Sequence, residues 1–162
     1  MLDIRRNDPA ALRPFADLNI AWIRELHWVE DSDQAMYDHP ETYHAGRNSV
    51  FSVWEGDEVI GVCALKEDSD GRFELTKMAV SEAARGKGVG AALMEAVEGY
   101  ARNALGLDEI YLLSNTKNAA AIRLYERCGW SVDFNGTHPQ YGRCNIGMSK
   151  QLTPQGDMGK RP

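Results

Sequence analysis

The residues with the clearest chemical potential lie in a glycine-rich stretch that reads Arg85-Gly86-Lys87-Gly88-Val89-Gly90. Glycines at alternate positions leave backbone N–H groups accessible, because no Cβ atom keeps a ligand away. After this stretch, apolar residues recur at spacings of three and four, which predicts a helix that begins here. The free N–H groups of a helix start, together with the positive end of its dipole, bind anions. The stretch therefore predicts a site for a diphosphate.

Two common phosphate-binding motifs do not fit this stretch. It lacks the Gly-Lys-Ser/Thr ending of the P-loop, and no Ser or Thr is placed to hold magnesium. It also lacks the Gly-x-Gly-x-x-Gly spacing of the dinucleotide fingerprint, because Gly86, Gly88 and Gly90 are evenly spaced. The pattern that does fit is Arg-x-x-Gly-x-Gly, which follows the strand predicted to end at Val80. Taken alone, this motif also fits a glycine-rich turn that binds nothing.

A second segment makes the interpretation more specific. It reads Asn118-Ala-Ala-Ala-Ile-Arg-Leu-Tyr125-Glu-Arg-Cys-Gly129-Trp130. The first motif resembles the acetyl-CoA loop of the GNAT superfamily of N-acetyltransferases. The second is similar to that superfamily's Asn-x-x-Ala-x-x-Leu-Tyr-x-x-x-Gly-Phe helix, with Trp130 in place of Phe. The resemblance covers about residues 49–148, and it implies acetyl-CoA as cosubstrate and no metal.

Glu74 is the candidate general base under this resemblance. Acetyl transfer to an amine requires that the amine lose a proton, because an ammonium with a pKa of about 10.4 is no nucleophile. Glu74 precedes Val80 by six residues, the offset of the general base in the histone-acetylating branch of the superfamily. Strand alternation predicts that Glu74 shares a face with Thr76, Met78 and Val80. An ordinary glutamate, exposed or paired with Lys77 or Arg72, is the alternative.

Tyr125 is the candidate general acid. By resemblance, its hydroxyl would lie near the coenzyme sulfur and protonate the departing thiolate. A phenol with a pKa of about 10 can supply a proton to a thiolate whose thiol has a pKa of about 8.5. The alternative is a core tyrosine whose hydroxyl is satisfied within the protein.

The resemblance also implies contacts for the pantetheine arm. Backbone groups of Met78, Ala79 and Val80 would pair with it as an added strand does, and one amide would stabilise the oxyanion. The superfamily has a bulge in this strand, which no glycine marks in the sequence. Asn118 would hold the pantetheine, or it would only cap its helix.

Acceptor-binding residues are sought in the region that walls this pocket in the superfamily and on the predicted last strand. The first holds Trp28, Glu30 and Asp33, whose aromatic and acidic groups suit an amine. The acidic run from Glu30 also fits a solvated link between helices. On the predicted last strand, Tyr141, Arg143 and Asn145 alternate and share a face, which either contacts the acceptor or simply faces water. If Arg143 faces the pocket, it favours an acceptor that carries a carboxylate as well as an amine.

The chain as a whole is predicted to form one α/β (α+β) domain over residues 1–152, followed by a tail at 153–162 that is predicted to be flexible. The resemblance implies the GNAT fold, a mixed and mostly antiparallel sheet of six to seven strands with helices on both faces. Strands are predicted at 2–6, 49–55, 59–66, 74–80, 108–114, 130–134 and 141–148. Helices are predicted at 11–26, 39–45, 89–104 and 117–129.

Composition narrows the class of protein and its partners. A chain of 162 residues with 43% hydrophobic residues is long enough to bury a core. The net charge of −6 argues against nucleic acid and suits a cationic substrate. Cys63, Cys128 and Cys144 show no Cys-x-x-Cys spacing, and the four histidines match no metal spacing. With no apolar signal region and no spanning stretch, a cytoplasmic protein without a membrane partner is predicted.

The sequence thus predicts an N-acetyltransferase that acts on a primary amine of a small molecule, amino acid or peptide by direct attack on acetyl-CoA. A catalytically silent module that binds CoA as a sensor is the rival hypothesis. The resemblance also makes a homodimer conceivable, although no residue pattern demonstrates one.

Overall fold

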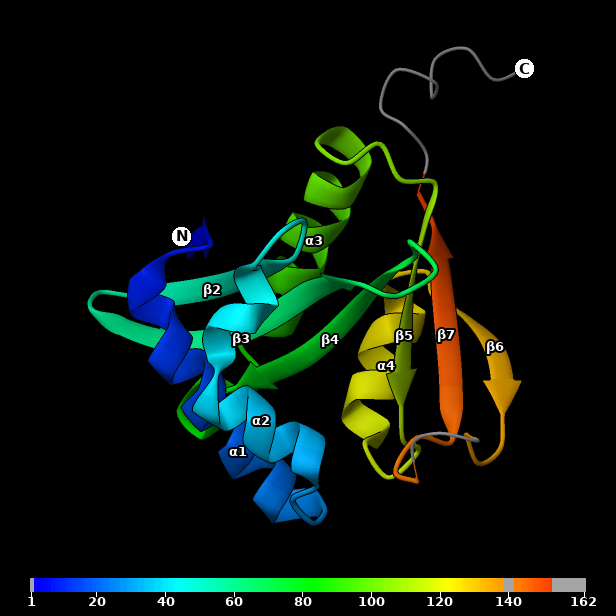
Figure 1. The fold of residues 1–162 in the computed structure, drawn as a ribbon, viewed down its shortest axis with the longest axis horizontal. Coiled ribbons are helices and arrows are strands. Elements are labelled where there is room, and N and C mark those ends of the chain that lie inside the picture. The colour runs from blue at the N-terminus through cyan, green and yellow to red at the C-terminus, as the bar shows by residue number, and fades with distance from the viewer. Residues whose placement is uncertain (1, 139–141, 153–162) are drawn as a thin grey trace.

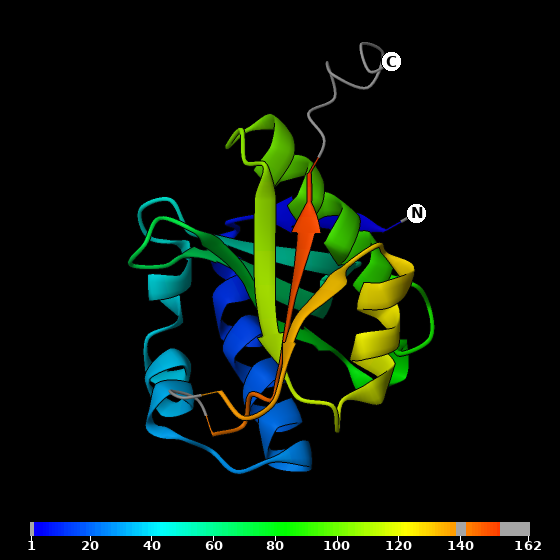
Figure 2. The ribbon, with the colours of Figure 1, turned by 90° about the vertical axis from the view of Figure 1, so that its right-hand side faces the viewer.

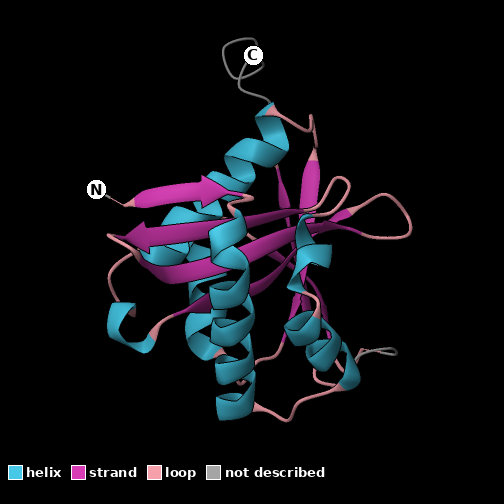
Figure 3. Ribbon diagram, turned by 60° about the vertical axis from the view of Figure 1, so that its left-hand side comes forward, coloured by secondary structure: helices cyan, strands magenta, loops and turns pink. Residues whose placement is uncertain are grey.

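The computed structural model describes residues 2–138 and 142–152 and shows a seven-stranded sheet with helices on both faces (Figures 1–3). The strand order is β1-β2-β3-β4-β5-β7-β6. All neighbouring pairs are antiparallel except β4 and β5, which are parallel. The predicted fold class, a mixed and mostly antiparallel sheet between helices, is confirmed.

The strands agree closely with the hydrophobic pattern. Their bounds are β1 Asp3–Arg6, β2 Ser49–Glu55, β3 Glu58–Glu67, β4 Phe73–Val80, β5 Glu109–Ser114, β6 Ser131–Asn135 and β7 Ile146–Gln151. The sheet divides between β4 and β5. The structure describes both strands in full, and the only pairing between them joins Glu74 to Tyr111. Figure 1 shows β2 to β4 running across the view, while β5 to β7 stand nearly upright. This division opens the sheet near its centre.

Four α-helices cover the two faces. They are α1 Leu12–Leu26, α2 Asp31–Asp38, α3 Val89–Asn103 and α4 Ala119–Arg127. Short 3-10 turns lie at Pro9–Ala11, Pro40–His44 and Glu82–Ala84. One core cluster joins α1 and α2 to the sheet, through residues such as Phe15 and Met36. A second cluster joins α3 and α4 to the opposite face, through residues such as Leu93 and Tyr125. Helix α4 ends before Gly129, whose φ of +91° forms a left-handed cap at the end of the helix.

A bulge in β4 changes the predicted facing of its residues. The pairing with β3 shifts between Val62 and Ala64, and Lys77 has a φ of +56°. Before the bulge, Phe73 and Leu75 pack into the cluster with α3, so Glu74 and Thr76 face the side of α1. After it, Met78 and Val80 pack on the α3 side, and Ala79 faces α1. The expectation that Glu74 shares a face with Met78 and Val80 is therefore wrong.

The acidic run after α1 is helical and not a solvated link. Glu30 is the N-cap of α2, and a reciprocal capping box joins it to Asp33. Four consecutive polar residues concealed this helix from a search for apolar periodicity. The helix predicted at 39–45 is reduced to the 3-10 turn at Pro40–His44.

The last strand begins later than predicted. β7 starts at Ile146, and Arg143 and Asn145 lie in the preceding loop, so they do not alternate along a strand. There, the Asn145 side chain accepts a hydrogen bond from Thr116 N, which fixes the loop against the end of β5. Tyr141 and the predicted tail at 153–162 lie outside the described residues. Within the described chain, no helix has both the length and the apolar character needed to cross a bilayer.

Candidate active site

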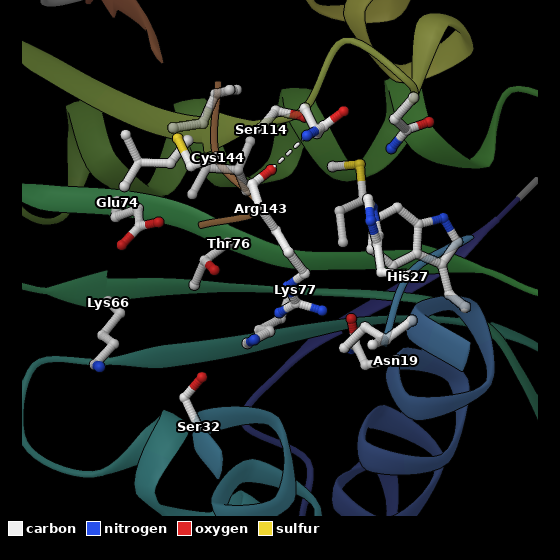
Figure 4. A pocket seen from close by; sticks show the side chains of 18 of the residues that line it. Asn19, His27, Ser32, Lys66, Glu74, Thr76, Lys77, Ser114, Arg143 and Cys144 are labelled. Atoms are coloured by element: carbon white, nitrogen blue, oxygen red, sulfur yellow. Dashed lines mark hydrogen bonds between the residues drawn. The ribbon is translucent and has the colours of Figure 1, made fainter. Parts of the chain in front are cut away.

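A cavity of about 260 Å³ lies where β4 and β5 diverge (Figure 4). Its walls come mainly from α1, β4, β5, α4 and the loop before β7, and β3 and α2 each contribute one residue. The residues of interest along it are Glu74, Thr76, Lys77, Met78, Asn118, Tyr125, Glu30 and Arg143. Elements that are distant in sequence therefore meet at the opening in the sheet.

Glu74 lines this cavity from near the start of β4. Burial raises the pKa of its carboxyl group to about 6, against the opposing influence of Lys66 and Lys77. Neither predicted partner neutralises it, since Lys77 pairs with Asp33 and Arg72 pairs with Glu109. A carboxylate with a pKa near neutrality suits proton abstraction at physiological pH.

Tyr125 lines the same cavity from α4 and is 8% exposed. Its ring packs against Trp130, with ring centroids 6.2 Å apart. Burial raises the pKa of the hydroxyl above its usual value, so the phenol stays protonated at neutral pH. No hydrogen bond joins this hydroxyl to another residue of the described chain, which differs from the alternative of a satisfied core tyrosine. The hydroxyl therefore carries its proton at neutral pH, while the raised pKa also makes it a weaker acid than a phenol in water.

The glycine-rich stretch forms the turn before α3. Gly86 and Gly88 both have a φ of +80°, and Gly88 is the N-cap of the helix. No side chain caps this helix start. A Cβ atom built on Gly88 would meet nothing within 4 Å, so the space beside the loop is open. The Arg85 guanidinium points elsewhere and lies 3.4 Å from Glu25. The loop therefore presents backbone amides, as the sequence predicts for an anion site.

Asn118 occupies the N-cap position of α4 and lines the cavity. Its side chain makes no capping hydrogen bond, so the capping alternative does not account for it. Asn115, in contrast, is used within the protein: its Nδ2 donates to Arg143 O at 2.6 Å, and its Oδ1 accepts from Lys117 N.

The predicted acceptor residues divide into three groups. Glu30 and Arg143 line the cavity, and Arg143 Nε lies 3.0 Å from Glu30 Oε1. Asp33 is fully buried and pairs with Arg143 and Lys77 instead of facing the cavity. Trp28 is 56% exposed and lies outside the cavity lining, because the chain leaves α1 at Leu26 and turns this side chain to solvent. Trp28 contributes to the cavity wall only indirectly, because its backbone carbonyl accepts a hydrogen bond from Arg143 Nη1.

Asn19 and Lys77 are two of the polar residues of this wall that sequence reasoning did not assign to the site. Asn19 on α1 is 1% exposed, donates to Phe15 O and lines the cavity. A polar residue four positions after Phe15 on the apolar stripe was the available signal. Lys77 carries the left-handed bulge, and nothing in a sequence marks a lysine for that conformation. Among the described residues, no group of His, Cys, Asp and Glu side chains could hold a metal ion.

Comparison with known proteins gives a consistent result. The model of the acetyltransferase (GNAT) family matches residues 17–130. A mycothiol acetyltransferase of Corynebacterium efficiens is 29% identical over 122 residues, covering 67% of this chain and 41% of that protein. The spermine/spermidine N(1)-acetyltransferase of Bacillus subtilis is 27% identical over 143 residues, covering 77% of this chain and 92% of that protein. The chain thus spans less than half of the Corynebacterium relative.

Solved structures share the fold. A GNAT-family acetyltransferase of Staphylococcus aureus has a TM-score of 0.81 at 17% identity, covering 94% of this chain and all of that one. The spermidine N-acetyltransferase of Vibrio cholerae in complex with CoA and spermine has a TM-score of 0.71 at 22% identity. That match covers 94% of this chain and 96% of the Vibrio chain.

Proposed function

Because the chain belongs to the GNAT family of acetyltransferases, we propose that it transfers an acetyl group from acetyl-CoA to a compact primary amine. One observation carries this proposal. A carboxyl group with a raised pKa, Glu74, and a protonated phenol, Tyr125, line a single cavity where the sheet opens. An acceptor and a thioester that meet there have a proton acceptor and a proton donor within the same cavity.

The proposed residues act at five points: the diphosphate, the pantetheine arm, the thioester oxygen, the amine and the departing sulfur. The amides of residues 86–90 bind the diphosphate of the cosubstrate, and Asn118 holds its pantetheine arm. Backbone groups of Met78, Ala79 and Val80 extend along that arm, and one amide donates to the thioester oxygen as negative charge develops. Glu74, directly or through a water, accepts the proton that the amine loses. Tyr125 donates its proton to the sulfur as the C–S bond breaks, while the new C–N bond completes the amide.

The charges of the cavity favour a compact amine over a polycation. Glu30 and Glu74 are its acidic lining residues, and Lys66, Lys77 and Arg143 are its basic ones. A long polyamine requires an excess of carboxylates along its length, which this lining does not provide. The guanidinium of Arg143 is engaged by Glu30 and Asp33. We therefore assign Arg143 to the pocket wall and do not expect it to select acceptors that carry a carboxylate.

Turnover of an amine panel tests this function and the rival sensor hypothesis together. Release of free thiol from acetyl-CoA is measured with monoamines, amino acids, short peptides and spermidine. We expect acetylation of compact primary amines at a higher kcat/KM than that of spermidine. A preference for spermidine would overturn the argument from charge. Tight binding of acetyl-CoA without turnover of any acceptor would instead support the sensor.

The diphosphate site is tested by substitution of Gly88. Gly88→Ala places a methyl group in the open space beside the loop amides, so we expect the Kd for acetyl-CoA to rise about tenfold or more. Gly71→Ala is the matched control, because Gly71 has a φ of +82° and equally open surroundings but lies in the turn before β4. Both changes strain the backbone by about 1–2 kcal/mol. Calorimetry that finds the same affinity in both variants would remove the loop from the site.

A further inference from the structure

Lys77 adopts a backbone conformation that a lysine rarely adopts. Among the described residues, only Asn7 and Lys77 have a positive φ without being glycine. Asparagine tolerates this region because its short side chain bonds locally, whereas lysine gains no such contact and keeps the clash of its Cβ atom. A strained residue of this kind persists only where its surroundings hold it.

The Lys77 side chain shows what holds it. Its Nζ lies 3.3 Å from Asp33 Oδ1, and the side chain is only 17% exposed. Asp33 is itself fully buried near the start of α2. Asp33 Oδ2 accepts a hydrogen bond of 2.8 Å from Glu30 N, and Arg143 Nη2 lies 2.9 Å from the same carboxylate. Lys77 is therefore tied to a group that is fixed from two other directions.

This tie joins three segments across the opening of the sheet: α2, the bulge in β4 and the loop before β7 (Figure 4, where Lys77 and Arg143 lie together). The carboxylate of Asp33 remains ionised, since its pKa is lowered. Burial acts to raise that pKa, but the Glu30 amide, Lys77 and Arg143 together outweigh burial. A buried, ionised carboxylate between two cations gives a rigid connection.

The conformation of Lys77 decides where the next amides point. β3 pairs Ala64 with Thr76 and Val62 with Ala79, so Lys77 and Met78 lie between two regular stretches of ladder. If φ at Lys77 returned to the extended region, the strand after it would move out of register with β3. The backbone of Met78 and Ala79 would then lose its placement beside the cavity.

We propose that Asp33 is a positioning residue, which holds Lys77 in its left-handed conformation and thereby places the backbone of Met78 and Ala79 toward the reacting thioester. The catalytic consequence rests on the proposed function, whereas the conformational part does not. Asp33 acts through the backbone of β4 and touches neither substrate.

Two substitutions of Lys77 test this proposal. Lys77→Ala and Lys77→Gly both remove the ammonium group, but only glycine adopts a positive φ without strain. We expect kcat to fall about tenfold or more in Lys77→Ala and to fall much less in Lys77→Gly. Lys66→Ala and Lys66→Gly are the matched pair, because Lys66 lines the same cavity from the regular strand β3. Glycine should give no advantage there. Equal losses in the two Lys77 variants would overturn the proposal.

Asp33→Asn supplies the second arm, because the amide keeps the shape of the side chain and loses its charge. We expect Asp33→Asn to lower kcat in the parent and to have no further effect in Lys77→Gly. The same loss in both backgrounds would show that Asp33 acts in another way. Loss of a buried ion pair would lower Tm in the parent and in Lys77→Gly alike. A general loss of stability therefore cannot produce a fall in kcat that is confined to the parent.

The φ of residue 77 provides a readout that needs no activity. Its three-bond HN–Hα coupling, measured by NMR, should report the left-handed value in the parent and an extended one in Asp33→Asn. An unchanged coupling would overturn the conformational part. If the parent acetylates no amine in the panel, the proposed function fails, while this coupling still decides whether Asp33 holds the bulge.

Discussion

Tyr125→Phe should lower kcat by about 10²-fold and leave the affinity for acetyl-CoA close to that of the parent. The substitution removes the proton that we assign to the departing thiolate and keeps the ring that packs against Trp130. The hydroxyl bonds to no other residue of the described chain, so its loss breaks no internal contact. Thiol release measures kcat, and calorimetry measures the Kd.

Tyr100→Phe is the control for this prediction. Tyr100 packs on Phe51 and under Arg6, away from the cavity, so loss of its hydroxyl should leave kcat unchanged. An acetyl donor whose leaving group departs without a proton offers a second comparison. With such a donor, the loss of kcat in Tyr125→Phe should be smaller than with acetyl-CoA. Equal turnover of Tyr125→Phe and the parent would make Tyr125 a packing residue only.

Glu74→Gln should abolish the rise of kcat/KM with pH that we expect near pH 6. The base accepts a proton only when ionised, and burial raises the pKa of Glu74 to about 6. The amide keeps the shape of the side chain and cannot accept the proton as a carboxylate does. We therefore expect a lower and flatter profile between pH 5 and pH 7, with Glu67→Gln as a control that keeps the rise. A parent-like profile in Glu74→Gln would assign the proton to solvent or a backbone carbonyl.

The same substitution should stabilise the protein above pH 6. A carboxyl group whose pKa is higher in the folded state than in the unfolded state favours folding when protonated. That contribution is fully present below pH 4.5 and is lost as the pH rises to about 6. A shift of this size corresponds to about 2 kcal/mol, which glutamine would retain at neutral pH. Urea unfolding at pH 5 and pH 8 measures the difference. A gain in stability with a loss of rate is expected where a residue serves activity.

Local patterns in the sequence were sufficient to predict most of the helices and strands around the site. The spacing of Leu93 and Val97 marked α3, and the glycines before it marked the turn whose Gly86 and Gly88 are left-handed in the structure. The helix that carries Tyr125 could be predicted at 117–129 because a helix has a fixed period. These features depend on neighbours in sequence, so one sequence suffices to find them.

Features that depend on distant partners could not be found in this way. The bulge at Lys77 reverses the facing of Met78, and its support comes from Asp33, more than forty positions earlier in the chain. Arg143 could be placed near the pocket, but the two carboxylates that engage it belong to a helix without an apolar pattern. Such contacts arise only when the fold brings charged groups together and removes them from water.

The division of the sheet gives this protein more strand edges than its topology suggests. An open sheet has two edges, which here are β1 and β6. Because β4 and β5 share only the pairing of Glu74 with Tyr111, each also presents unpaired backbone groups inside the molecule. Unpaired edges recruit any extended chain within reach, and proteins ordinarily cover or shorten them against aggregation. A cosubstrate bound between β4 and β5 would therefore also keep these edges from pairing with another copy of this chain.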